Sequence, residues 1–156
     1  MSDHEVWRLI EDQYREGFPR FVRVARAVTG DRESAIDAVQ EGFVDALRRA
    51  DQSTGRGPLE GWVWGCVLNR ARKARRRTGV AFEIHGAAPL HEQDADLRLR
   101  LAALPERQRL VVFLRYFADL SYQEIATAVG IEVGTVSATL HAAHRALRDE
   151  LKEAQA

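Results

Sequence analysis

The strongest constraint on the fold is the stretch YQEIATAVGIEVGTVSATLH, which starts at residue 122. Its fifth residue is Ala126, its ninth is Gly130 and its fifteenth is Val136. A small residue lets two helices cross closely, a glycine supplies positive φ in the turn between them, and a valine fills the angle that they form. The spacing predicts a helix-turn-helix, and a helical hairpin that serves only packing is the alternative.

The preceding residues support this unit. Ser121 and Glu124 have the spacing of a capping box, in which each side chain accepts a hydrogen bond from the other residue's backbone N–H. A helix expected from Glu106 to Phe117 brings Leu110 and Leu114 as a supporting layer. The C-terminal part of the chain is therefore predicted to be a small helical bundle around the motif.

The second helix of the motif has one apolar stripe and one outward face. The stripe is Val136, Leu140, Ala143, Leu147 and Leu151. The first turns of the outward side offer Thr135, Ser137, Ala138 and Thr139, followed by His141, Ala142 and Arg145. Such short side chains make single hydrogen bonds or contact a thymine methyl, and they lack the bidentate arginine–guanine pair. We therefore expect weak base recognition, with phosphate contacts from Arg109, Arg115, Arg145 and Arg148.

Breaks in the helical pattern divide the rest of the chain. Helices are expected over about 5–28, 32–50 and 58–77. Pro19 predicts a kink in the first, while Gly30 and Asp31 end that helix and cap the next. Residues 51–58, DQSTGRGP, have the composition of a loop, and Pro58 suits the start of a helix.

Residues 79–97 are expected to be a flexible linker. They contain four acids, no Lys or Arg, and no sustained period. Helical patterning returns at about residue 98 and is broken at Pro105, Asp119 and Gly130. No strand alternation or internal repeat is present. The predicted class is all-α, with two small helical domains at 1–78 and 98–156.

The net charge of zero hides an asymmetry, because residues 1–78 carry +3 and the remainder −3. Six of the eight residues in RARKARRR (70–77) are basic. The expected third helix has two opposite faces. The apolar face consists of Val63, Trp64, Val67, Leu68 and Ala71. The opposite face consists of Trp62, Asn69, Lys73 and Arg76, with Arg72 beside it. Such an exposed tryptophan among cations can stack on unpaired bases and hold phosphates. A solvated basic helix end with a half-buried tryptophan is the alternative.

The expected second helix hints at a protein partner. Its core stripe is Ile36, Val39, Phe43 and Leu47. The opposite face places Val44 among the polar residues Asp37, Gln40, Glu41 and Arg48. Isolated exposed apolar residues are also normal, so the hint is weak by itself.

Catalytic and metal chemistry is poorly supported. Cys66 is the one cysteine and lacks an obvious base partner. His141 and His144 point to different sides of one helix, and no third ligand follows at the spacing of a metal site. No signal peptide or membrane span is evident. We expect a cytoplasmic protein that is not an enzyme and has no cofactor.

Three segments together resemble a known family. They are FPRFVRVARAVTGDRESAIDAVQEGFVDALRRA, GPLEGWVWGCVLNRARKARRR and LPERQRLVVFLRYFADLSYQEIATAVGIEVGTVSATLHAAHRALRDEL. The chain resembles a bacterial extracytoplasmic-function (ECF) sigma factor of the sigma-70 family, which keeps only regions 2 and 4. The resemblance implies that residues 1–78 are region 2 and that 98–156 are region 4. It also implies two partners, core RNA polymerase and promoter DNA, and leaves open whether an anti-sigma factor binds.

The resemblance also assigns sites. It implies that region 2 docks on the clamp helices of the largest polymerase subunits through Asp37, Gln40, Glu41 and Val44. Recognition and melting of the minus-10 element would fall to Arg56, Trp62, Asn69, Arg72, Lys73 and Arg76. Docking of region 4 on the minus-35 element would fall to Arg109, Arg115, Thr135, Ser137, Ala138, Thr139, His141 and Arg145.

Two departures from the family pattern modify these expectations. Many members carry lysine or arginine where this chain has Ser137, Thr139 and Ala142, and an aspartate where it has Lys73. The first departure weakens the expected minus-35 recognition, and the second adds positive charge beside the melted strand. A stand-alone helix-turn-helix regulator is the alternative function, although it would need a dimer to span two half-sites and no heptad repeat is visible.

Overall fold

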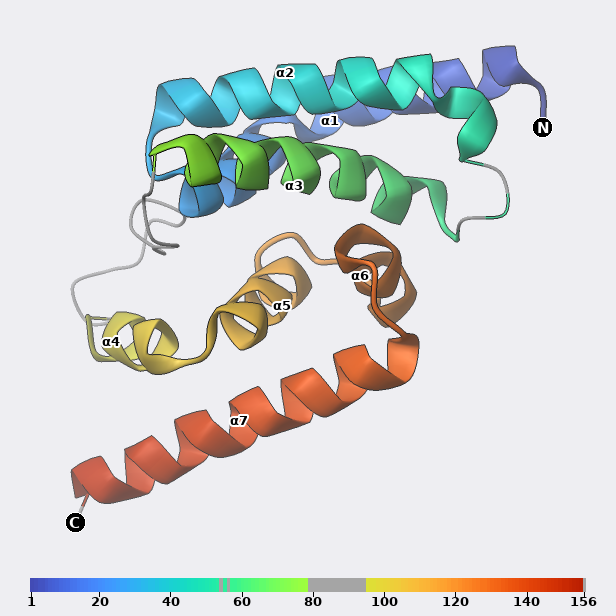
Figure 1. Cartoon of the computed structure of the whole chain (residues 1–156). Coiled ribbons are helices and arrows are strands. Elements are labelled where there is room, and N and C mark those ends of the chain that lie inside the picture. Colours follow the sequence, from blue (N-terminus) through green and yellow to red (C-terminus); the bar gives the residue numbers. More distant parts are fainter. Residues whose placement is uncertain (54, 56, 79–94, 156) are drawn as a thin grey trace.

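The computed structural model describes residues 1–53, 55, 57–78 and 95–155. Within these ranges the chain forms α-helices and no strand, which confirms the predicted all-α class (Figure 1). The helices are Asp3–Thr29 (α1), Arg32–Arg48 (α2), Leu59–Thr78 (α3), Ala95–Ala103 (α4), Glu106–Tyr116 (α5), Tyr122–Val129 (α6) and Val133–Gln155 (α7). A short 3-10 helix, η1, covers Ala50–Gln52. Residues 79–94 of the expected linker lie outside the described residues, and its last three residues belong to α4.

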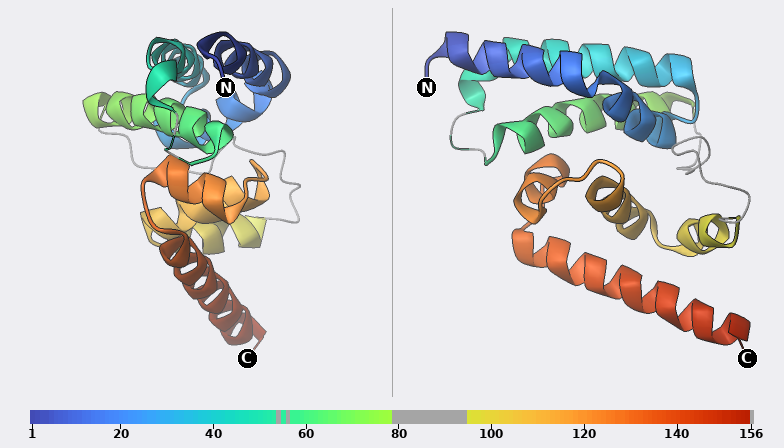
Figure 2. Two further views of the ribbon diagram at one scale, coloured as in Figure 1. Left: turned by 90° about the vertical axis from the view of Figure 1, so that its right-hand side faces the viewer. Right: turned by 180° about the vertical axis from the view of Figure 1, so that it is seen from behind.

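Local sequence signals set the helix ends in the N-terminal half. Gly30 follows α1 with φ of 94°, a left-handed conformation that glycine adopts without a steric penalty. Asp31 then caps α2, because its carboxylate accepts a hydrogen bond of 2.7 Å from the Ser34 N–H. Pro19 lies inside α1, which bends in its second half (Figure 2).

Helices α1, α2 and α3 pack into one layered bundle around aromatic side chains. The rings of Phe21 and Trp64 stack with centroids 3.9 Å apart, and Phe43 meets Phe21 edge to face. At Gly42, α2 approaches α3 so closely that an added Cβ would lie 2.6 Å from the Cα of Val67. The N-terminal half therefore has its own densely packed core.

The C-terminal half contains the predicted helix-turn-helix in α6 and α7. The Ser121–Glu124 capping box is present in both directions, and Gly130 has φ of 79° in the turn. The chain turns by 102° between α6 and residues 133–149 of α7, an angle typical of this motif. Val136 and Leu140 are buried against α5 and α6, as the period predicted.

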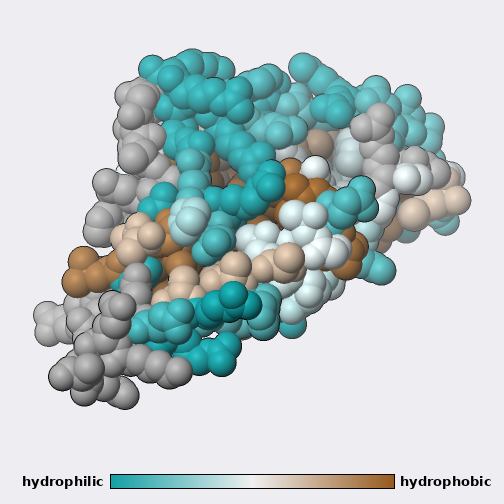
Figure 3. Space-filling model, turned by 60° about the horizontal axis from the view of Figure 1, so that its bottom comes forward, coloured by the Kyte–Doolittle hydropathy of each residue, from teal (hydrophilic) through white to brown (hydrophobic). Residues whose placement is uncertain are grey.

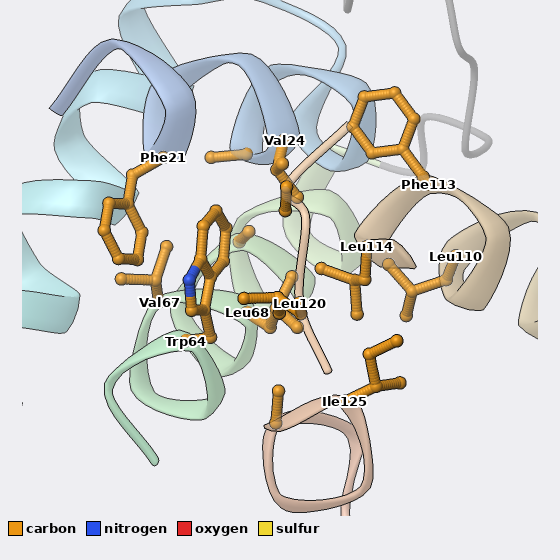
Figure 4. Close-up of a cluster of buried hydrophobic side chains, with 14 of the residues drawn as sticks. Phe21, Val24, Trp64, Val67, Leu68, Leu110, Phe113, Leu114, Leu120 and Ile125 are labelled. Atoms are coloured by element: carbon orange, nitrogen blue, oxygen red, sulfur yellow. The ribbon is translucent and has the colours of Figure 1, made fainter. Parts of the chain in front are cut away.

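The two halves also pack against each other. Helix α6 lies beneath the N-terminal part of α3 (Figure 1), and the two helices are in contact. Figure 4 shows Trp64 and Leu68 of α3 in one apolar cluster with Leu114, Leu120 and Ile125. This contact between the halves was not part of the sequence-based expectation, and it changes the surroundings of one predicted site.

Candidate polymerase and nucleic-acid interfaces

The face of α2 expected to bind polymerase is exposed. Asp37, Gln40 and Glu41 point to solvent, and 44% of Val44 is accessible. Ile36, Val39, Phe43 and Leu47 face inward and leave this side of the helix free. The structure thus brings the four predicted residues together on one surface.

An open groove of about 340 Å³ runs between this face and α1. Helix α2 contributes Gln40, Phe43, Val44 and Leu47, and α1 contributes Ile10, Glu11, Tyr14 and Arg15. Its lining is mostly apolar, with charged side chains from α1 at the edge, so it suits a partner side chain of the same character. Sequence reasoning missed these α1 residues as part of the surface. Their spacing of three and four residues was a signal that they share one face of α1.

Arg70 belongs to this α2 surface rather than to a DNA-binding cluster. Its guanidinium donates hydrogen bonds to both carboxylate oxygens of Asp45, at 2.5 and 2.8 Å, and reaches Glu41 at 3.4 Å. The hydrogen bonds from Arg70, together with its charge, hold the pKa of Asp45 below the ordinary value. The first cation of the basic run is therefore already neutralised within the protein.

Part of the remaining basic end of α3 is exposed to solvent. Asn69, Lys73 and Arg76 are exposed, as their face predicted. Arg72 is half-buried, and its pKa is lowered by burial and by the neighbouring charge of Arg75. Arg56, also expected to contact DNA, lies outside the described residues.

The prediction that Trp62 is exposed was wrong, because only 7% of its surface is accessible. The N-terminal half covers one side of the ring, where the Arg49 guanidinium lies 6.0 Å from its centroid. Trp62 also lines a cavity of about 810 Å³ whose other wall includes Gln123, Ala126 and Thr127 of α6. A helical wheel of α3 shows one apolar face, whereas the folded helix packs on two sides.

The outward face of α7 matches the expectation. Ser137, Ala138, His141 and Arg145 are exposed, and Thr135 and Thr139 are half-buried. The Thr139 hydroxyl donates a hydrogen bond of 2.6 Å to the Thr135 carbonyl, which leaves it less available to a base. Figure 3 brings the side of the molecule that carries α7 toward the viewer. On this side, pale and tan surface of low polarity borders strongly hydrophilic surface. The first turns of α7 therefore offer few strong base-reading groups.

Two arginines expected to contact phosphates are engaged within the protein. Arg109 donates a hydrogen bond of 2.8 Å to the Ala102 carbonyl. Arg115 donates to the Leu120 carbonyl at 3.0 Å, and its guanidinium lies 5.5 Å from the centroid of the Tyr122 ring. Arg109 ties α5 to α4, and Arg115 ties it to the loop before α6, so DNA would have to compete for these side chains or use their remaining donors.

Among the described residues, neither histidine of α7 lies in a cluster that could hold a metal ion. His144 Nε2 lies 2.8 Å from the Tyr116 hydroxyl, within hydrogen-bond distance. No cluster of His, Cys, Asp or Glu suited to a metal occurs in the part of the chain that the structure describes. Cys66 is buried, and burial raises its pKa to about 11, which disfavours the reactive thiolate. Among the same residues, no individual helix has the length and apolar content to span a membrane, and α6 with α7 qualifies only as a bent pair.

Two family models match these halves. Sigma-70 region 2 matches residues 13–80, and Sigma-70, region 4 matches residues 94–147. The RNA polymerase sigma-E factor of Streptomyces avermitilis is 30% identical over 151 residues, covering 91% of this chain and 84% of that protein. The ECF RNA polymerase sigma factor SigL of Mycobacterium tuberculosis is 31% identical over 146 residues, covering 84% and 82%.

Other similar proteins include the ECF RNA polymerase sigma factor SigE of Mycolicibacterium smegmatis, at 29% identity over 157 residues. This chain spans 61% of the length of that SigE. Solved structures of similar fold include CnrH in complex with the cytosolic domain of CnrY, with a TM-score of 0.70, 22% identity, and coverage of 97% of this chain and 95% of that one. RpoE in complex with the anti-sigma factor NepR from Bartonella quintana gives a TM-score of 0.62, 24% identity, and coverage of 91% and 98%.

The family matches cover both halves in the expected order, and they confirm the resemblance drawn from the sequence motifs. The chain therefore belongs to the ECF RNA polymerase sigma factors, a family of transcription initiation factors.

Proposed function

We propose that this chain directs core RNA polymerase to promoters, with residues 1–78 recognising and melting the minus-10 element and 98–156 docking on the minus-35 element. The observation that carries the polymerase interface is the exposed α2 face of Asp37, Gln40, Glu41 and Val44 beside an apolar groove. An exposed valine between acids and next to an apolar groove fits a partner with apolar and basic side chains.

The test of this interface is co-elution with a cognate core polymerase on a sizing column. Asp37→Arg/Glu41→Arg reverses two charges on the proposed surface and is expected to abolish co-elution. Asp3→Arg/Asp149→Arg makes the same charge change at exposed positions of α1 and α7 and is expected to bind like the native chain. Failure of the native chain to bind would contradict the proposal and favour an independent helix-turn-helix regulator.

The proposed minus-10 site combines Trp62 with the exposed Asn69, Lys73 and Arg76. Asn69 and the two cations are positioned to hold a DNA backbone, and Trp62 offers a ring for an unstacked base. Because Trp62 is covered here, base stacking requires that its surroundings open.

A second test separates melting from polymerase binding. Trp62→Ala is expected to reduce open-complex formation, measured by permanganate reactivity of unpaired thymines, while co-elution with polymerase is retained. Trp7→Ala is the matched control, because Trp7 is half exposed on α1. Equal loss of melting and of polymerase binding in Trp62→Ala would contradict the proposed role.

The proposed minus-35 contact is weak by itself. The first turns of α7 present Thr135, Ser137 and Ala138, and no lysine or arginine precedes Arg145 in this helix. Attachment to a polymerase that already holds the same promoter raises the effective concentration of region 4, so a weak reader still contributes to promoter choice.

A further inference from the structure

A cleft of about 400 Å³ at the basic end of α3 is lined by arginines from both halves of the chain. Helix α3 contributes Arg72 and Arg75, and the first turn of α5 contributes Glu106 and Arg107. Three guanidinium groups (+3) and one carboxylate (−1) give these side chains a formal charge of +2. We call this feature the arginine cleft, and its charge favours an anionic ligand.

The position of Arg72 on α3 separates it from the exposed cations of the same helix. Arg72 and Arg75 are three residues apart and share one side of α3, whereas Lys73 and Arg76 project about 100° farther round. No hydrogen bond or ion pair joins the Arg72 guanidinium to another described residue. Burial and the nearby charge of Arg75 lower the pKa of Arg72. A half-buried cation without a partner is unfavourable, and a bound anion would offset that cost.

The start of α5 adds backbone donors to the arginine cleft. Pro105 precedes this helix and provides no side-chain cap. The Arg109 N–H donates to the Pro105 carbonyl at 3.0 Å, so the N–H groups of residues 106–108 have no acceptor within the helix. Because Glu106 and Arg107 line the cleft, this first turn forms part of its wall. Unsatisfied N–H groups and the positive end of the helix dipole attract phosphate groups.

The size and the remaining lining of the arginine cleft suit a small phosphorylated molecule. Val28, Leu110 and Val129 form an apolar wall beside the arginines. A volume of about 400 Å³ lies within the range of small-molecule sites, which combine apolar lining with a few polar groups. Arginine guanidinium groups bind phosphate oxygens in pairs. Two such groups, Arg72 and Arg107, flank the space, so two adjacent phosphates match the cleft better than one.

We propose that the arginine cleft binds the diphosphate group of a small ligand, either free pyrophosphate or a nucleoside diphosphate. The phosphates lie between Arg72 and Arg107 at the start of α5, and the ion pair with Glu106 holds Arg75 at the edge of the site. Such a ligand joins α3 to α5. The site does not depend on the proposed contacts with polymerase or promoter DNA.

Isothermal titration calorimetry of the whole chain tests the site, with pyrophosphate, ADP and adenosine as probes in buffer without divalent cations. Pyrophosphate and ADP are expected to bind at a single site, and adenosine is not, because it has no phosphate. Tighter binding of ADP than of pyrophosphate would assign a nucleotide as the ligand, and the reverse order would assign free pyrophosphate. No saturable binding of either phosphate probe, or equal binding of adenosine, would overturn the proposal.

Matched variants locate the binding. Arg72→Gln and Arg107→Gln should each weaken pyrophosphate binding about tenfold or more, because each removes charge-assisted hydrogen bonds. Arg8→Gln makes the same charge change at an exposed position of α1, roughly 30 Å along the helix from Val28, and should bind like the native chain. An equal loss in all three variants would show a general attraction of charge and overturn the site.

Urea unfolding distinguishes a binding arginine from a structural one. Without ligand, Arg72→Gln should keep or raise the urea midpoint, because it removes a half-buried charge that its neighbours repel. Saturating pyrophosphate should raise the midpoint of the native chain but not that of Arg72→Gln. A lower midpoint of Arg72→Gln without ligand would assign Arg72 to packing between the helices and overturn its proposed role.

Discussion

Replacing Gly42 by alanine is expected to destabilise the N-terminal half by forcing α2 away from α3. A Cβ at this position would lie 2.6 Å from the Cα, 2.8 Å from the Cγ2 and 2.9 Å from the backbone nitrogen of Val67. Contacts under 3.0 Å are essentially absent from real proteins, so the two helices must separate. Because two of the three atoms are backbone, a change of rotamer cannot relieve the clash.

The magnitude follows from two opposing effects. Overpacking of a dense core costs about 1–3 kcal/mol, and a backbone clash places this case near the upper end. Alanine in a helix interior recovers up to about 1 kcal/mol relative to glycine. We therefore expect the free energy of unfolding to fall by about 2 kcal/mol in Gly42→Ala.

The assay is urea unfolding followed by far-ultraviolet circular dichroism, with the midpoint and slope fitted together. Gly134→Ala serves as the control, because it makes the same change in α7 without a nearby atom and should not lower stability. A Gly42→Ala chain as stable as the native chain, with an unchanged slope, would refute the packing argument at α2 and α3.

Three further predictions address charge, thiol chemistry and promoter recognition. The bonds from Arg70 lower the pKa of Asp45, so this pair stabilises the fold above the ordinary value of 3.8 and the stabilisation is lost as the pH falls through the lowered pKa. Arg70→Met should therefore lower the urea midpoint at pH 7 more than at pH 3, and an equal loss at both would contradict this. Because the pKa of Cys66 is raised to about 11, a thiol reagent at pH 8 should label the folded chain far more slowly than the urea-unfolded chain; equal rates would show that the thiol is accessible. In a transcription assay over single-base promoter variants, changes in the minus-35 element should reduce initiation less than changes in the minus-10 element, since the first turns of α7 lack cations; the reverse order would refute weak minus-35 recognition.

Helix boundaries and the helix-turn-helix were predictable because their causes are local. Gly30 and Gly130 adopt positive φ, and Ser121 with Glu124 forms the expected capping box. These features depend on residues within a few positions of each other in the chain. The outward residues of α2 were predictable for a related reason. One face of α2 is apolar and buried, and the opposite face is mostly polar and exposed, as its helical period indicates.

The groove beside Val44 and the pairing of Arg70 were less accessible to sequence reasoning. The groove needs Ile10 and Tyr14 from α1, which are distant from α2 in the chain. Arg70 belongs to a continuous basic run, but its direction on α3 places it against Asp45, 25 residues earlier. The partners of long charged side chains depend on how helices cross, and the crossing is set by packing.

The sequence by itself determined the helices, the order of the two halves and the family. Tertiary structure decided that the halves pack together and that Trp62 is covered. A helical period identifies which residues share a face, but it does not reveal how many faces another element will bury. On α3 the apolar side packs in its own half and, through Trp64 and Leu68, also against the other half, and the glycines at 61 and 65 admit a second helix from residues more than 50 positions later. That contact is non-local, so it follows only from the folded arrangement of the whole chain.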